Sequence, residues 1–206
     1  MNVNIKRLSP DAQIPTYAHA TDAGFDLVAA ADVIIEPGAT ACVPTGLAFE
    51  IPEGYEMQIR PRSGITLNTK LRVQLGTVDA GYRGEVGVIV DNIAREEWGS
   101  TPRLRTLNGK VENIDGTYYP KSTYIIRKGD RIAQAVIKPV EQAVFTEVDA
   151  LGNSDRGAGG FGSSGVIAES YEKANERNGG ALERLAKEET HLESTGIAFD
   201  LPKEDA

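Results

Sequence analysis

Residues 33–54 read VIIEPGATACVPTGLAFEIPEG. Two short runs of mostly apolar residues, Val33–Ile35 and Ala48–Ile51, are each followed directly by a turn that contains Pro and Gly. Short runs of β-branched and aromatic residues closed by Pro and Gly are typical of strands joined by tight turns. This stretch therefore predicts a sheet built of short strands.

Runs of the same kind continue along the chain, at Val86–Val90, Thr123–Arg127, Ile132–Ile137 and Val144–Val148. No helical periodicity of useful length occurs before residue 166, and the runs do not alternate with helices as a βαβ repeat would. The sequence predicts an all-β domain of the sandwich or jelly-roll class over residues 1–165.

The last 41 residues differ in composition. Residues 166–206 hold 10 acidic and 5 basic side chains, whereas residues 1–165 hold 20 and 17. We expect helices over 167–178 and 181–194, followed by an edge strand over 197–201. This segment is therefore predicted to be an acidic, partly helical C-terminal extension.

The composition excludes several classes of protein. With 40% hydrophobic and 25% charged residues, the chain is globular, and its net charge of −8 argues against a nucleic-acid-binding surface. The apolar runs are too short to span a membrane, and the N-terminus lacks a signal core, so we expect a cytoplasmic protein. The lone Cys42 excludes a disulfide within one chain and is expected to be a small buried hydrophobe.

A glycine-rich segment, RGAGGFGSSG, covers residues 156–165. Glycines let backbone N–H groups turn toward an anion, Arg156 offers a planar fork for phosphate oxygens, and Phe161 could stack on a nucleobase. A dinucleotide-binding loop and a Walker A motif do not fit, because no strand precedes the glycines and no Gly-Lys-Ser/Thr is present. A flexible linker is the alternative.

Four other segments carry polar residues at turns or strand ends. They are DAGFDL at 22–27, PRSGI at 61–65, GTVDAGYRGE at 76–85 and GDRIAQ at 129–134. A carboxylate fixed in a rigid turn, such as Asp79, can orient a water molecule and accept its proton. Each segment alone is also compatible with an ordinary turn.

Taken in order, the five segments resemble the five motifs of the trimeric dUTPase family, over roughly residues 3–165. The resemblance implies a distorted jelly roll, a homotrimer whose active sites combine motifs from all three chains, and Mg²⁺-dependent hydrolysis of dUTP to dUMP and pyrophosphate. Such an enzyme keeps uracil out of DNA and supplies dUMP for thymidylate synthesis.

The resemblance also implies roles for single residues. Asp79 would orient the water that attacks the α-phosphorus, Tyr82 would lie under the deoxyribose, and a hairpin at 73–78, with Gly76 and Val78, would read the uracil edge. The phosphates would be bound by Arg62, Ser63, Gly64, Gln134, Arg156, Gly162 and Ser163, and Phe161 would cover the base. Mg²⁺ would be held by phosphate oxygens and water without a direct protein ligand, with Asp26 reaching it through water.

Two features depart from most of the family. The segment 93–126, called the insert below, is longer than compact members need and resembles insertions in dUTPases of phages that infect Gram-positive bacteria. It is interpreted either as a site for a protein partner or as a surface hairpin without one. The extension 166–206 follows the fifth motif, and a docking device, a trimer brace and a disordered tail all remain open.

Two rival functions are weighed against dUTP hydrolysis. A dCTP deaminase would share the fold and the second and third motifs, but it needs a carboxylate where this chain has Ile89, so deamination is disfavoured. A phage-type regulatory protein could bind a repressor through the insert, in addition to catalysis. A phage-encoded and a cellular bacterial origin both remain open.

Overall fold

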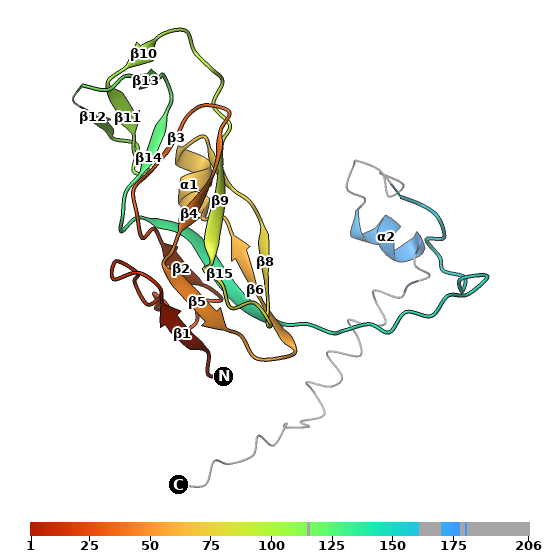
Figure 1. The fold of residues 1–206 in the computed structure, drawn as a ribbon. Coiled ribbons are helices and arrows are strands. Elements are labelled where there is room, and N and C mark those ends of the chain that lie inside the picture. Colours follow the sequence, from red (N-terminus) through yellow and green to blue (C-terminus); the bar gives the residue numbers. More distant parts are fainter. Residues whose placement is uncertain (115, 161–169, 178–179, 181–206) are drawn as a thin grey trace. The chain divides into compact units, whose positions relative to one another are not determined.

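The computed structural model describes residues 1–114, 116–160, 170–177 and 180 (Figure 1). The chain divides into two units, Met1–Phe145 and Thr146–Ala206, called unit 1 and unit 2 below. The division precedes residues 156–165, so the glycine-rich segment belongs to unit 2.

All but one of the described helices and strands of unit 1 are strands, which confirms the all-β prediction. The predicted run at 33–35 is β3, and the runs that begin at Ala48, Val86, Thr123 and Ile132 correspond to β5, β9, β14 and β15. The strands are β1 (Asn4–Arg7), β2 (Phe25–Val28), β3 (Val33–Ile35), β4 (Thr40–Pro44), β5 (Leu47–Glu50), β6 (Tyr55–Arg60), β7 (Leu71–Val73), β8 (Gly76–Asp79), β9 (Gly87–Asn92), β10 (Ser100–Thr101), β11 (Arg103–Arg105), β12 (Val111–Asn113), β13 (Tyr119–Pro120), β14 (Tyr124–Ile126) and β15 (Arg131–Pro139).

Three sheets position the candidate site. Their strand orders are β2-β15-β6-β8, β4-β9-β7 and β12-β11-β14-β3. Alternate side chains of β2, β6, β7 and β9 point inward and join one core, as the period of two in a strand requires. Fully buried members of this core include Leu27, Val43, Met57, Leu71, Val88 and Ile126.

A short helix, α1 (Ser63–Asn68), lies in unit 1, although no helical periodicity of useful length occurs before residue 166. Its six residues are too few to show a helical period. The helix is held by contacts from outside its own sequence: Ile65 is buried, and Arg72 donates hydrogen bonds to the carbonyls of Thr66 and Thr69 near the helix end. Such caps satisfy carbonyls that the last turn leaves free.

Two predictions from the sequence are wrong. Val144–Val148 forms no strand, and the side chains of Val144 and Phe145 are 95% and 92% exposed. No described strand pairs with this run, and an apolar sequence alone supplies no ladder partner. Cys42 is exposed, because its neighbour Val43 points into the core and successive strand residues face opposite sides.

The insert forms small antiparallel pairings of its own. Strand β10 pairs with β13, and β11 pairs with β12. Strand β11 also pairs in parallel with β14, which connects the insert to β3. Figure 1 shows β10 to β13 at one end of unit 1 and β1 with β5 at the other.

Unit 2 contains helix α2 (Tyr171–Arg177), within the range 167–178 expected to be helical. The expected helix at 181–194 and the strand at 197–201 lie outside the described residues. In the described ranges, neither α1 nor α2 has the length and apolar character of a bilayer-crossing helix.

Candidate active site

Asp26 on β2 binds two arginines. Its Oδ1 lies 2.9 Å from Arg62 Nε, an ion pair without hydrogen-bond alignment, and its Oδ2 accepts a hydrogen bond of 3.1 Å from Arg131 Nη1. Arg62 Nη1 also donates to the carbonyl of Arg131 at 3.0 Å. The Asp26 side chain is only 19% exposed, so its carboxylate is largely buried. It holds the positive charges of Arg62 and Arg131 close together.

A β-bulge sets the position of Arg131. The register between β15 and β2 shifts between Arg131 and Ala133, and bulges of this kind redirect a side chain at the end of a ladder. In the preceding turn, Asp130 Oδ2 accepts a hydrogen bond from the Arg127 N–H. The same strand carries Gln134, whose backbone lies opposite Asp26 on one side and Arg60 on the other.

Two cavities adjoin this cluster and share Arg62, Arg131 and Gln134. The first, called the arginine cavity, has a volume of about 340 Å³ and is also lined by Arg60 and Asp26. The second, called the insert cavity, has a volume of about 390 Å³. Shared guanidinium groups and a carboxamide are donors suited to a planar or tetrahedral oxyanion.

The second predicted motif opens onto the insert cavity. Strand β6 ends at Arg60, and α1 starts at Ser63. Ser63 and Gly64 are exposed and line the cavity together with Arg62 and Gln134. The structure therefore brings these four predicted site residues together, next to Asp26, which pairs with Arg62.

The third predicted motif lies elsewhere in the same chain. Asp79 ends β8 opposite Glu56, whereas the arginine cluster lies beyond Arg60 at the other end of β6. At about 3.3 Å a residue, Glu56 and Arg60 are roughly 13 Å apart along the strand. Neither Asp79 nor Tyr82 lines the two cavities.

The predicted hairpin over residues 73–78 is wrong. Strand β7 pairs with β9, and β8 pairs with β6, so Val73 and Gly76 lie in different sheets and do not form a two-stranded ladder. The segment crosses between sheets instead. Gly76 and Val78 are both partly buried on β8.

Tyr82 is fixed by the turn that follows Asp79. Its N–H donates to the Asp79 carbonyl at 3.0 Å, and its hydroxyl donates to the Glu85 carbonyl at 2.9 Å. The ring lies against Gly84, where an added Cβ would be 2.6 Å from Tyr82 Cζ. Tyr82 is 47% exposed, so part of its aromatic ring faces solvent three residues after Asp79.

Arg156 lies in unit 2. Its Nε donates to the Gly159 carbonyl at 2.8 Å, and Gly157 adopts a φ of 50° while its N–H donates to Ser154. Phe161, Gly162 and Ser163 lie outside the described residues.

An ion-pair network ties the insert to the turn before Arg131. Arg127 Nη1 lies 2.6 Å from Asp32 Oδ2, and Nη2 lies 2.5 Å from Glu112 Oε2 on β12. A hydrogen bond from the Lys128 N–H and then one from Arg127 lower the pKa of Asp32, while Glu112 and Asp32 raise the pKa of Arg127.

Sequence reasoning did not single out Arg131 or Asn108. Arg131 stands in the quoted segment at 129–134, where a guanidinium at a strand start, three residues before Gln134, was a usable signal. Asn108 of the insert lines the cavity beside Arg62 only through tertiary structure. Its one local signal was the Asn108-Gly109 turn.

A family model and a known bacterial protein both match most of this chain. The family model described as dUTPase matches residues 10–98 and 117–165, leaving out 99–116 of the insert. A deoxyuridine 5'-triphosphate nucleotidohydrolase of Thermobifida fusca is 45% identical over 176 residues, which are 84% of this chain and 84% of the relative.

Two solved structures of phage proteins are also similar. A variant of the Staphylococcus bacteriophage 80alpha dUTPase with dUpNHpp has 36% identity and a TM-score of 0.77, covering 80% of this chain and 99% of that one. A variant of the dUTPase from phage phi11 of S. aureus, described with a structural Mg(II) ion, has 34% identity and a TM-score of 0.70, covering 73% and 98%.

Proposed function

The chain belongs to the dUTPase family and is a deoxyuridine 5'-triphosphate nucleotidohydrolase, and from this premise we propose which of its residues hold and cleave dUTP. The assignment rests on one observation above all, the pair of guanidinium groups that Asp26 holds between two cavities.

Arg62, Arg131 and Gln134 bind the triphosphate, with Ser63 and Gly64 beside them. Guanidinium groups bind phosphate oxygens through paired charge-assisted hydrogen bonds, which are about twice as strong as neutral ones. The Asp26 carboxylate fixes both side chains before substrate arrives, so less side-chain entropy is lost on binding. Asp26 therefore acts as a positioning residue.

Asp79 orients the water that attacks the α-phosphorus. The new bond forms from the water oxygen to that phosphorus, the bond to the bridging α–β oxygen breaks, and pyrophosphate leaves with the electron pair. The carboxylate accepts the water proton as the bond forms. Its place at the end of β8, in a turn closed by the Tyr82 N–H, supports this role because the backbone there is fixed.

Tyr82 lies under the deoxyribose and leaves no room for a 2′-hydroxyl. The half-exposed ring and its anchored hydroxyl support this assignment. Gly76 and Val78, on the strand that leads to Asp79, bind the uracil edge through their backbone groups. In unit 2, Arg156, Gly162 and Ser163 bind the terminal phosphate, and Phe161 covers the base.

The complete site is shared between copies of the chain in a homotrimer. Within one chain, Asp79 and the arginine cluster lie at opposite ends of β6. A triphosphate bound at the cluster of one copy therefore meets the Asp79 of another, as cyclic symmetry allows. We place this trimer in the bacterial cytoplasm, in line with the bacterial and phage sources of its relatives.

Mg²⁺ fits this site as an ion carried by the substrate. Both Asp26 oxygens already bind arginines, so the carboxylate is better suited to a water of the ion than to the ion itself. When bound, Mg²⁺ neutralises part of the charge on the phosphate oxygens.

One assay tests the proposed function. The purified protein is incubated with dUTP, dCTP, dTTP or UTP and Mg²⁺, and pyrophosphate and ammonia are measured. We expect pyrophosphate from dUTP alone, abolished by EDTA and restored by Mg²⁺. Ammonia from dCTP, or pyrophosphate from all four nucleotides at similar rates, would overturn the proposal.

A further inference from the structure

Building on the proposed function, we infer that the insert adds a residue to the phosphate-binding site: the side-chain amide of Asn108 donates hydrogen bonds to the β- or γ-phosphate of dUTP. The insert cavity is lined by Arg62, Ser63, Arg131 and Gln134 from the core of the fold and by Leu107 and Asn108 from the insert. The family model does not match residues 99–116, so this contact is an addition to the five motifs.

The turn that carries Asn108 is rigid. The Thr106 N–H donates to the Lys110 carbonyl at 2.9 Å, and the Gly109 N–H donates to the Thr106 carbonyl at 3.1 Å. Gly109 has a φ of 80°, a conformation that favours glycine. Asn108 Oδ1 accepts hydrogen bonds from the Thr106 hydroxyl and the Lys110 N–H, so the acceptor end of the amide is fixed.

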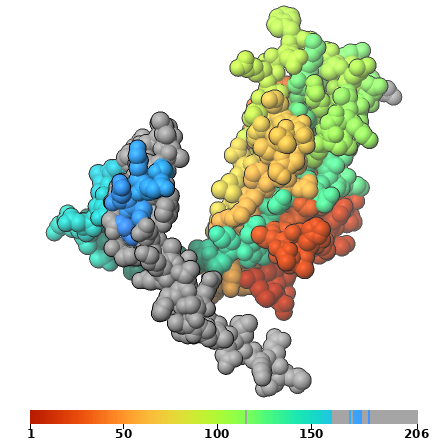
Figure 2. All heavy atoms as spheres, turned by 180° about the vertical axis from the view of Figure 1, so that it is seen from behind, coloured from red at the N-terminus to blue at the C-terminus, as the bar shows by residue number. Residues whose placement is uncertain are grey.

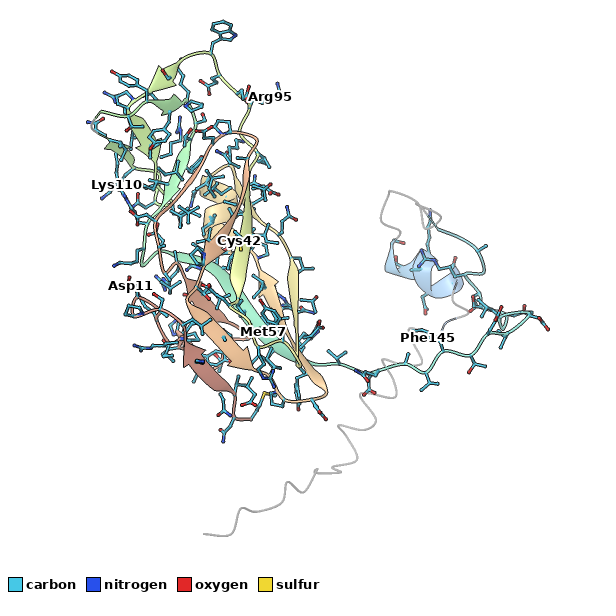
Figure 3. The ribbon with its side chains drawn as sticks, viewed as in Figure 1. Asp11, Cys42, Met57, Arg95, Lys110 and Phe145 are labelled. Carbon is cyan, nitrogen blue, oxygen red and sulfur yellow. The ribbon has the colours of Figure 1, made fainter. Side chains whose placement is uncertain are left out.

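The turn is also anchored to the rest of unit 1. Leu107 packs against the core, and the strand after the turn is held by Glu112, which binds Arg127. Figure 3 labels Lys110 in this turn, on the side of the insert nearer to the rest of unit 1. Figure 2 shows the gold atoms of α1 on the surface beside the green atoms of the insert.

The free end of the amide is a donor. With Oδ1 engaged, Nδ2 has two N–H groups, and no partner for them is recorded among the described residues. The neighbouring arginines make the cavity attractive to anions, and an N–H donor adds to such a site whereas an acceptor would oppose it. Asp130 also lines the cavity, and its Oδ2 accepts the hydrogen bond from the Arg127 N–H. A phosphate oxygen is the ligand that fits the two arginines, Gln134 and the free amide of Asn108 together.

The test uses Asn108→Asp in the full-length enzyme. Aspartate keeps the acceptor that closes the turn, but it replaces the donor with a negative charge. We expect an unchanged Tm, a Kd for dUpNHpp raised about 10- to 100-fold, and an unchanged Ki for dUMP, which lacks the β- and γ-phosphates. Asn108→Ser, which is neutral, should raise the Kd about three- to tenfold.

Asn113→Asp is the matched control, because Asn113 is an exposed residue of β12 in the same insert and does not line the cavity. It adds the same charge and should leave the Kd for dUpNHpp unchanged. The inference is overturned if Asn108→Asp binds dUpNHpp like the wild type, if Asn113→Asp weakens binding equally, or if the Ki for dUMP rises in parallel. Wild-type hydrolysis of dUTP and its loss in Arg62→Ala test the proposed function separately.

Discussion

Asp79 and Arg62 lie toward opposite ends of strand β6: Asp79 pairs with Glu56 near its start, and Arg62 follows its last residue, Arg60. About 13 Å of strand separates Glu56, the ladder partner of Asp79, from Arg60, so we assign the two residues to a site shared between two chains. The roles proposed for Asp79 and Arg62 therefore go together with the proposed homotrimer, in which one chain supplies Asp79 and another supplies Arg62.

Replacing Asp79 separates catalysis from binding. In Asp79→Asn, the oxygen that accepts the proton of water is lost while the size of the side chain is kept. We expect kcat to fall about 10²- to 10⁴-fold with a Kd for dUpNHpp within about threefold of the wild type. Glu53→Gln, in the exposed turn after β5, is the control for removing a carboxylate and should retain full activity. A near-normal kcat in Asp79→Asn would show that another group orients the water.

Removing the charge of Asp26 should affect binding more than turnover. Asp26→Asn loses both ion pairs, so Arg62 and Arg131 lose the group that fixes them. We expect KM for dUTP to rise about tenfold and kcat to change less. Steady-state kinetics with dUTP measure both parameters. A drop in kcat at unchanged KM would contradict the positioning role.

A methyl group at residue 84 should weaken sugar selection. A Cβ at Gly84 would lie 2.6 Å from Tyr82 Cζ, so Gly84→Ala must displace the ring. We expect the preference for dUTP over UTP, as a ratio of kcat/KM, to fall about tenfold. Gly81→Ala is the matched control, because its Cβ would meet nothing within 4 Å and its φ is not positive. If Gly84→Ala and Gly81→Ala prefer dUTP over UTP to the same degree, the deoxyribose does not lie on Tyr82.

The stability contributed by Asp32 should depend on pH. Hydrogen bonds from the Lys128 N–H and from Arg127 lower its pKa below the ordinary value of 3.8, so its contribution is present above that value and is lost as pH falls through the lower, folded value. Asp32→Asn should lower Tm by a few degrees at neutral pH, by a constant amount down to about pH 4, and by less below it. Thermal unfolding followed by circular dichroism measures the difference. If the difference in Tm between the wild type and Asp32→Asn grows as the pH falls below 4, folding raises the pKa of Asp32 instead of lowering it.

Local patterns were enough to predict much of the fold. The strands at Val33–Ile35 and Ile132–Ile137 were predicted because their signals, β-branched residues and flanking turn residues, are close together in the sequence. The exposure of Cys42 could also have been predicted, since an inward Val43 requires an outward Cys42. What the sequence did not show depends on distant partners: α1 needs Arg72 to bind its carbonyls.

The candidate site shows the same division. Arg62, Ser63 and Gln134 were predicted from their motifs, and the fold brings them together because Gln134 lies opposite Arg60 on the neighbouring strand. The separation of Asp79 from this cluster follows from the antiparallel register of β8 on β6, in which Asp79 lies opposite Glu56. The family resemblance implied a site divided between chains, but no local pattern in the sequence shows this register. The approach of Asn108 to Arg62 likewise requires the packing of the insert hairpin on the core.

Complementation between two inactive variants tests the shared site most directly. Asp79→Ala and Arg62→Ala are refolded together in equal amounts, mixed trimers are verified by native mass spectrometry, and dUTP hydrolysis is measured. Random assortment leaves about a quarter of the sites with an intact Arg62 from one chain and an intact Asp79 from another, so activity should return to roughly that fraction of the wild type. Mixed trimers as inactive as either variant alone would show that both residues serve a site within one chain.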